Sequence, residues 1–147
     1  MQRSLVGSEM CIRDRNTINC EQNCNLLDAK ALGNWGEDIA RQYIEQQGLK
    51  IVTTNYKTKV GEIDIIAKNG LTYHFIEIKA RRGVTHGLPR EAVSKRKQKH
   101  IKQAAMYFIR DLRAQNRKWK ELSFDVVEVY VHEDLKATIH YMPQCFM

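Results

Sequence analysis

Residues 60–82 read VGEIDIIAKNGLTYHFIEIKARR, and the rest of the fold can be worked out from this stretch. Its alternating Ile, Val, Phe and Tyr residues are typical of two β-strands, and Asn69-Gly70 between them is a strong signal for a two-residue hairpin turn. Because an unpartnered buried charge is costly, charged residues are not expected inside such strands. Four nevertheless stand there: Glu62, Asp64, Glu77 and Lys79.

With Asn69 and Gly70 as the turn, the pairing of the strands follows by counting outward. Asp64 is then predicted to face Phe75, and Glu62 to face Glu77. Directly paired side chains project on the same side of a sheet, and each strand alternates sides with period two. One face is therefore predicted to carry Glu62, Asp64, Ile66, Tyr73, Phe75, Glu77, Lys79 and Arg81. The opposite, buried face is predicted to carry Ile63, Ile65, Ile76 and Ile78.

This concentration of acids has a chemical interpretation and a plainer one. Carboxylates that face one another across two strands repel, and a divalent cation removes that penalty. Mg²⁺ accepts two or three carboxylate oxygens and keeps positions for water and a phosphate oxygen. Lys79 would then place its ammonium group near the phosphate or the attacking water. The residues alone leave open a solvated, salt-bridged surface, on which each exposed pair contributes little.

Helices and strands are predicted on both sides of the hairpin. Helical spacing of apolar residues predicts a helix over 28–47, with Asp28 as its N-cap, and a strand follows over 49–57. A second helix is predicted over 95–114 after Ser94 as N-cap, and the apolar run 122–132 is typical of a strand buried on both faces. The segment 137–142 supplies a last strand, expected at an edge. The order αβββαββ predicts an α/β fold with a mixed sheet and a parallel pair across the second helix.

The chain is basic, with a formal net charge of +7, which favours phosphate-rich partners such as nucleic acid. Cations crowd the start of the second helix, where the helix dipole disfavours each by about 0.3 to 1 kcal/mol. Such a cost is typical of phosphate contacts, although a solvated basic face is the alternative for any single residue. The predicted nucleic-acid rim consists of Arg81, Arg82, Lys95, Lys97, Gln98 and Lys99.

The length of 147 residues suits one domain, and no run of 18 apolar residues predicts a membrane span. We expect a cytoplasmic protein without a membrane partner. Residues 1–27 are predicted to be a disordered tail. Within it, Ser4 to Arg15 (SLVGSEMCIRDR) resemble the translation of a sequencing-library adapter. The folded domain is predicted over 28–141, with a C-terminal tail over 142–147.

Several segments together resemble one known family. Asp64, then twelve residues, then Glu77-Ile78-Lys79 on a hairpin resembles the PD-(D/E)XK arrangement of the restriction-endonuclease-like superfamily. From about Gly33 to Val131 the chain is similar to the YraN-type family, uncharacterised bacterial proteins regarded as endonuclease-like. The segments that carry this likeness are GNWGEDIARQYIEQQGLKIVTTNY, GEIDIIAKNG, FIEIKARR, EAVSKRKQKHI and SFDVVEV. The resemblance implies the restriction-endonuclease-like fold, with Ile63 in the place of the name-giving proline.

The resemblance also implies roles for the matching residues. Asp64 and Glu77 would bind Mg²⁺ or Mn²⁺, with the backbone carbonyl of Ile78 as a further ligand. Lys79 matches the catalytic lysine, and Glu37 matches an assisting acid on the first helix. An exposed ion pair with Arg41 is the alternative for Glu37. The residues leave open whether Glu62 is a third ligand or a bystander.

The predicted function is metal-dependent hydrolysis of phosphodiester bonds in nucleic acid, with DNA as the expected substrate and branched DNA included. The first alternative is a nucleic-acid-binding module of the same fold without turnover. The second is an interaction protein whose acids form only salt bridges. Junction-cutting relatives act as dimers, so the sequence leaves a homodimer open.

Overall fold

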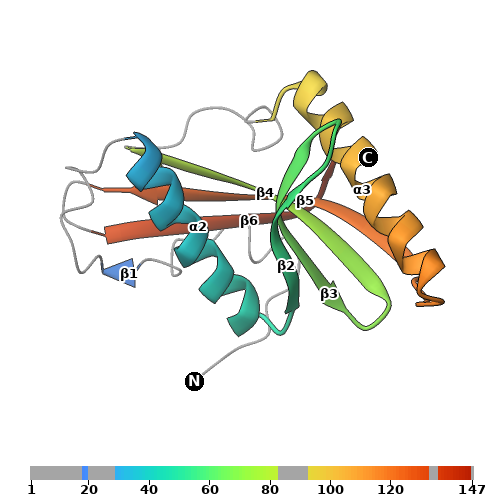
Figure 1. Cartoon of the computed structure of the whole chain (residues 1–147). Helices are drawn as coiled ribbons and strands as arrows, with labels where there is room; N and C mark the ends of the chain where they lie inside the picture. Colours follow the sequence, from blue (N-terminus) through green and yellow to red (C-terminus); the bar gives the residue numbers. More distant parts are fainter. Residues whose placement is uncertain (1–17, 20–28, 83–92, 133–135, 147) are drawn as a thin grey trace.

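The computed structural model describes residues 18–19, 29–82, 93–132 and 136–146. Its strands form one mixed sheet in the order β1-β6-β5-β4-β3-β2, against which two long helices pack (Figure 1). The α/β class is confirmed, and the architecture is consistent with a restriction-endonuclease-like fold. The helices are α2 (Ala29–Gln46) and α3 (Lys95–Ala114). The strands are β1 (Ile18–Asn19), β2 (Lys50–Lys57), β3 (Glu62–Asn69), β4 (Thr72–Arg82), β5 (Glu121–Val131) and β6 (Lys136–Phe146).

Both helices stop or start where local sequence signals predict. Ser94 caps α3, because its Oγ accepts a hydrogen bond of 3.1 Å from the backbone N–H of Lys97. α2 ends before Gly48, whose φ of +92° lies in the left-handed region that glycine adopts readily. The predicted N-cap of α2, Asp28, lies outside the described residues.

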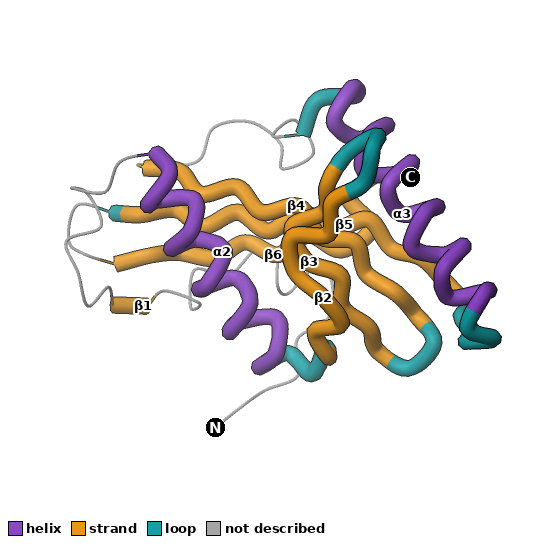
Figure 2. The backbone as a smooth tube through the Cα atoms, viewed as in Figure 1, coloured by secondary structure: helices purple, strands orange, loops and turns teal. Residues whose placement is uncertain are grey.

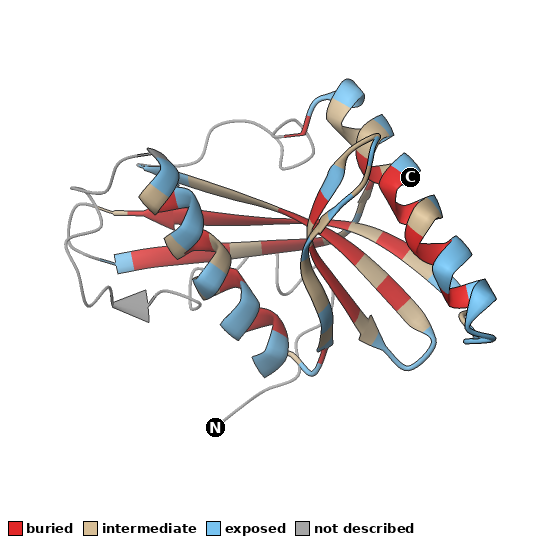
Figure 3. Ribbon diagram, viewed as in Figure 1, coloured by how far each residue is buried: buried red, intermediate tan, exposed pale blue. Residues whose placement is uncertain are grey.

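The two helices cover different parts and opposite faces of the sheet, and each has its own apolar core. α2 packs over β2, β4 and β5, where Ile44 belongs to the same buried cluster as Ile76. α3 contributes Phe108 to the second cluster, in which Phe75 is buried. Figure 3 shows buried residues along the inner sides of both helices and exposed residues along their outer sides. No helix in the described ranges is long and apolar enough to cross a membrane.

The strands after the hairpin follow in the predicted order, but β6 ends later than predicted and is not the edge strand, because β1 lies beyond it. β4 and β5 pair in parallel from Thr72 opposite Glu121 to Arg82 opposite Val131, as the crossover through α3 requires. β6 includes residues 142–146, which had been predicted as a C-terminal tail. The two-residue strand β1 pairs with the start of β6, and the sequence did not predict it. The remainder of residues 1–27, with the segment Ser4–Arg15, lies outside the described residues.

The predicted register of the hairpin is wrong by two residues. Asn69 pairs with Thr72, so the turn consists of Gly70 and Leu71 and not of Asn69 and Gly70. Gly70 has a φ of +62°, which suits the first position of a type II′ turn, where glycine is the preferred residue. Because side chains alternate with period two, a shift of two residues leaves the predicted face of each residue unchanged.

The shift does change which residues meet. The last pair of the β3–β4 ladder is Ile65 with Ile76, so Asp64 and Glu77 are the next residues on their strands. Glu62 pairs with Lys57 of β2. The prediction that Glu62 faces Glu77 is therefore wrong, and Glu77 stands level with Asp64 instead.

Beyond this point β3 leaves β4 and follows β2 toward the start of α3 (Figures 1 and 2). The turn between β2 and β3 lies close against α3, since a Cβ on Gly61 would come 2.9 Å from the carbonyl oxygen of His100. Ile63 accordingly packs in the α3-side core, and not beside Ile65 and Ile76 as predicted. We call this divergence of β3 and β4 the fork, and the predicted site residues stand at its base.

Candidate functional site

Asp64 and Glu77 lie together at the base of the fork. The backbone N–H of Ile78 donates a hydrogen bond of 2.8 Å to Asp64 Oδ2. This side-chain contact joins β3 and β4 just beyond the last pair of their ladder. The side chain of Glu77 is 4% exposed, and its Oε1 is buried without a hydrogen-bond partner among the described residues. A buried carboxylate oxygen of this kind carries an uncompensated desolvation cost, which a bound cation would offset.

The electrostatics of Glu77 reflect this crowding. Burial raises the pKa of Glu77 to about 8, and the charge of Asp64 and a hydrogen bond between the two carboxyl groups act in the same direction. Two ammonium groups oppose the rise. Lys97 Nζ, from α3, lies 3.9 Å from Glu77 Oε2, and Lys79 Nζ lies 3.6 Å from the same atom. Without a metal, Glu77 therefore holds a proton near neutral pH, which reduces its repulsion with Asp64.

Glu37 approaches the pair from α2. Its pKa is raised by burial and then by the negative charge of Asp64, so the two carboxyl groups interact. The side chain of Asn55 on β2, a residue that sequence analysis did not single out, donates a hydrogen bond to Glu37. Arg41, the alternative partner of Glu37, forms its ion pair with Asp38 at 3.6 Å. Glu37 thus interacts electrostatically with Asp64, while Arg41 also acts on Glu37 and lowers its pKa.

A close contact between α2 and β4 makes this approach possible. Gly36 precedes Glu37, and a Cβ at Gly36 would lie 2.6 Å from the Cβ of Ala80, the residue after Lys79. Only a residue without a side chain allows the helix backbone to come so near to the strand. Gly36 therefore sets the distance between Glu37 and the fork.

The arrangement fits a hard divalent cation on its donor chemistry. Over residues 18–19, 29–82, 93–132 and 136–146, no set of three His, Cys, Asp or Glu side chains converges into a complete metal site. Mg²⁺, however, is commonly bound by one or two carboxylates together with waters and substrate phosphates. Asp64 and Glu77 supply such oxygens. Glu62 is exposed, and strand pairing does not bring it to this pair.

The structure divides the predicted nucleic-acid rim among several places. Lys97 belongs to the carboxylate site, through its contact with Glu77. Arg82 is exposed at the end of β4. The remaining three rim residues of α3 line a groove at its surface: Lys95, Gln98 and Lys99.

Arg81, the last rim residue, is held by a buried acid that sequence analysis did not single out. Its Nε lies 3.5 Å from Glu128 Oε2, and the hydroxyl of Tyr130 donates a hydrogen bond of 2.5 Å to the same oxygen. In the parallel register Lys79 is level with Glu128, and Arg81 with Tyr130. The sheet face next to Glu77 therefore continues as an ordered row of charged and hydroxyl groups.

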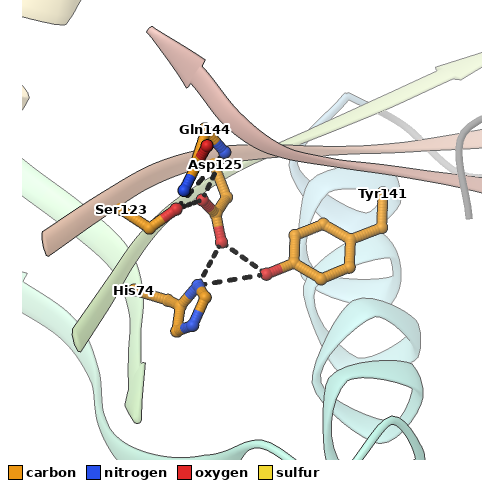
Figure 4. A network of polar contacts seen from close by, with 5 residues as sticks. All are labelled: His74, Ser123, Asp125, Tyr141 and Gln144. Carbon is orange, nitrogen blue, oxygen red and sulfur yellow. Dashed lines mark hydrogen bonds and ion pairs between the residues drawn. The ribbon is translucent and has the colours of Figure 1, made fainter. Parts of the chain in front are cut away.

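A second buried polar cluster lies across β4, β5 and β6 (Figure 4). Asp125 is fully buried, and all the partners drawn in Figure 4 converge on its carboxylate. Oδ2 accepts a hydrogen bond from the Tyr141 hydroxyl and lies 2.7 Å from His74 Nδ1. Oδ1 accepts hydrogen bonds from Ser123 Oγ at 2.5 Å and from the backbone N–H of Gln144 at 3.0 Å.

We interpret this cluster as structural. The pairing of β5 with β6 shifts register between Phe124 and Val126, and Gln144 has a φ of +51°. The carboxylate of Asp125 thus satisfies a backbone group at the place where the ladder is irregular. One sequence signal points to it, because Asp125 interrupts the apolar run SFDVVEV.

Comparison with known proteins finds relatives that this chain covers over most of their length. Residues 36–129 match the model of "Uncharacterised protein family UPF0102". A UPF0102 protein of Caldicellulosiruptor saccharolyticus is 42% identical over 106 residues, which cover 72% of this chain and 87% of that protein. One from Syntrophotalea carbinolica is 40% identical over 116 residues, covering 79% and 91%. One from Alkaliphilus metalliredigens is 41% identical over 118 residues, covering 80% and 99%. The matched segment contains the whole fork.

Proposed function

The chain belongs to the uncharacterised family UPF0102, the YraN-type family, and we propose that it is a metal-dependent nuclease that hydrolyses phosphodiester bonds in nucleic acid. The family name assigns no activity, so the support comes from the site. One observation carries the proposal: Glu77, beside Asp64, buries an Oε1 that has no hydrogen-bond partner among the described residues, while its Oε2 lies within 4 Å of two ammonium groups. Such a mixture of acids and cations is suited to bind a metal ion and a phosphate together.

Asp64 and Glu77 would hold Mg²⁺ or Mn²⁺, with the carbonyl of Ile78 as the further ligand that the resemblance implies. The N–H of Ile78 keeps the Asp64 carboxylate in position through its 2.8 Å hydrogen bond. When bound, the metal would lower the pKa of a water molecule and neutralise charge on the phosphate.

The lysines and Glu37 would supply the remaining chemistry. Lys79, 3.6 Å from Glu77, can hold the attacking water and stabilise the negative charge that develops on the phosphate. Lys97 presents a second ammonium group to the same site from α3. The raised pKa of Glu37 suits a group that accepts a proton and returns it.

The net charge of +7 favours a phosphate backbone, and DNA is the substrate that the restriction-endonuclease-like resemblance implies. Arg81 stands on the same face of β4 as Lys79, and Glu128 holds its guanidinium there. Arg81 would therefore contact a phosphate beside the one that is cut and fix the orientation of the strand.

The decisive experiment compares the wild type with Asp64→Asn. Both proteins are incubated with Mg²⁺ or Mn²⁺ and labelled linear, flapped, branched and single-stranded DNA, with RNA in parallel. The amide oxygen of Asn can still accept the hydrogen bond from Ile78, so the fold is retained while the metal loses a charged ligand. We expect cleavage to fall by at least about a hundredfold, with binding largely preserved. Asp38→Asn, an exposed acid on α2, is the matched control. Equal cleavage by wild type and Asp64→Asn would overturn the assignment.

A second candidate is a nucleic-acid-binding module without turnover. It is favoured by the contacts of Lys79 and Lys97 with Glu77, because the two ammonium groups stand at the site without a metal and could themselves contact a phosphate. This candidate predicts salt-sensitive binding and no cleavage of any nucleic acid in the panel, with either metal. Metal-dependent cleavage that Asp64→Asn abolishes would exclude it.

A further inference from the structure

The outer side of α3 contains a basic groove that the carboxylate site does not use. Its volume is about 470 Å³. Among the described residues it is lined by Lys95, Gln98, Lys99, Lys102, Gln103 and Met106. Met106 is 51% exposed, and Gln98 is anchored through a 3.0 Å hydrogen bond to the carbonyl of Val93. The groove therefore combines three ammonium groups with polar and apolar contact area.

This groove and the fork lie on opposite sides of the same helix. Lys97 points inward, where its Nζ reaches Glu77. At about 100° per residue, Lys95, Lys99 and Lys102 project about 140 to 160° away from Lys97. The body of α3, about 10 Å thick with its side chains, thus stands between the groove and Glu77.

The charge of α3 indicates what the groove would bind. The helix contains seven Lys or Arg residues and a single acid, Asp111, which lies near its C-terminal end. The lysines of the groove extend over about 10 Å along the helix axis, at 1.5 Å per residue. One strand of a duplex presents a phosphate about every 3.4 Å of its axis, so a short run of one backbone matches this spacing.

We propose that the groove binds the backbone of a second arm of a branched nucleic acid, while the arm to be cut lies at Glu77. The placement of one arm at Glu77 rests on the proposed nuclease function, whereas binding in the groove needs no turnover. A single duplex could reach both sides of α3 only by bending sharply within a few base pairs. DNA with a persistence length of about 150 base pairs resists this bending. A branch point allows two arms to pass on either side of the helix without that cost.

Binding is tested without cleavage, in EDTA, by fluorescence anisotropy. The probes are a labelled forked DNA and a linear duplex of the same total length, at several salt concentrations. The groove variant is Lys99→Gln with Lys102→Gln. The matched control is Arg117→Gln with Lys118→Gln, which removes the same charge from exposed positions beyond α3. Thermal melting verifies that each variant is folded, since Lys102 also approaches the Phe146 ring at 5.9 Å.

We expect the wild type to bind the fork more tightly than the duplex. The groove variant should lose this preference, weaken fork binding about tenfold at low salt, and reduce the salt slope for the fork by about two. Its affinity for the linear duplex should match that of the control. Equal weakening of fork and duplex would overturn the second-arm proposal, and so would fork binding that matches the control.

A cleavage assay separates this proposal from the nuclease proposal. If the wild type cuts no substrate but the groove variant still loses its preference for forks, the nuclease function fails and the groove proposal stands. If the wild type cuts, the groove variant should raise KM for forked DNA and leave kcat unchanged.

Discussion

Glu77 is the site residue that combines deep burial with charged neighbours of both signs. It is buried beside one acid and two lysines, and one of its oxygens has no partner among the described residues. A residue selected for stability alone would be apolar here, because its neighbours on the strand, Ile76 and Phe75, are fully buried. The carboxylate is therefore costly for the fold alone, and for this reason we assign it to a ligand.

The pH dependence of stability should reveal the raised pKa of Glu77. The pKa of about 8 in the folded protein lies above the ordinary value of 4.5, so metal-free folding is coupled to proton uptake. The stability that this proton supplies is complete below about pH 4.5 and is lost as the pH rises through 8. We expect the thermal midpoint of the wild type in EDTA to fall over this range relative to Glu77→Gln, in which this titration is absent. Parallel midpoint curves for the two proteins would contradict the raised pKa.

At the scale of the element, α2 places Glu37 through a single close contact. Gly36→Ala would bring a Cβ within 2.6 Å of the Ala80 Cβ, so the helix must shift. We expect a loss of about 1 to 3 kcal/mol in the free energy of unfolding, measured by urea denaturation, together with slower cleavage.

Gly33→Ala on the same helix is the matched control. No described residue lies within 4 Å of a Cβ there, and alanine favours a helix over glycine by about 0.8 to 1 kcal/mol. We expect this variant to be slightly more stable than the wild type. A change of the same sign in both variants would show that the contact with Ala80 does not position α2.

β5 shows how an element tolerates two buried acids. Asp125 receives hydrogen bonds or an ion pair from three side chains and one backbone group, and Glu128 contacts Tyr130 and Arg81. Glu77 differs, because its buried Oε1 has no hydrogen-bond partner in the part of the chain that the structure describes. This contrast separates acids that hold strands together from the acid that we assign to a ligand.

At the scale of the whole molecule, metal binding should stabilise the folded state by mass action. A cation that binds only the folded protein adds about 2.7 kcal/mol at a concentration of 100 Kd. We expect Mg²⁺ or Mn²⁺ to raise the thermal midpoint of the wild type, and to do so more at pH 8 than at pH 6, because the metal competes with the proton on Glu77. Asp64→Asn and Glu77→Gln should abolish this shift, while Asp38→Asn should retain it. A shift that survives both site variants would place the metal elsewhere.

Local pattern in the sequence was sufficient for the order of elements from α2 to β6, the N-cap of α3, the end of α2 before Gly48 and, apart from Ile63, the faces of the hairpin residues. The faces survived a register error of two residues because the side-chain period of a strand is two. The sequence did not decide the turn type, because alternative turns differ little in energy. Gly70 occupies the first turn position, which shifts the register so that Asp64 is level with Glu77 and not with Phe75.

The contacts of Lys97 with Glu77, of Glu37 with Asp64 and of Asp125 with Tyr141 join segments far apart in the chain. No local period predicts them, because they depend on how helices and strands pack. The residue types of the candidate site could therefore be identified from the sequence, whereas their assembly at the fork depends on tertiary packing.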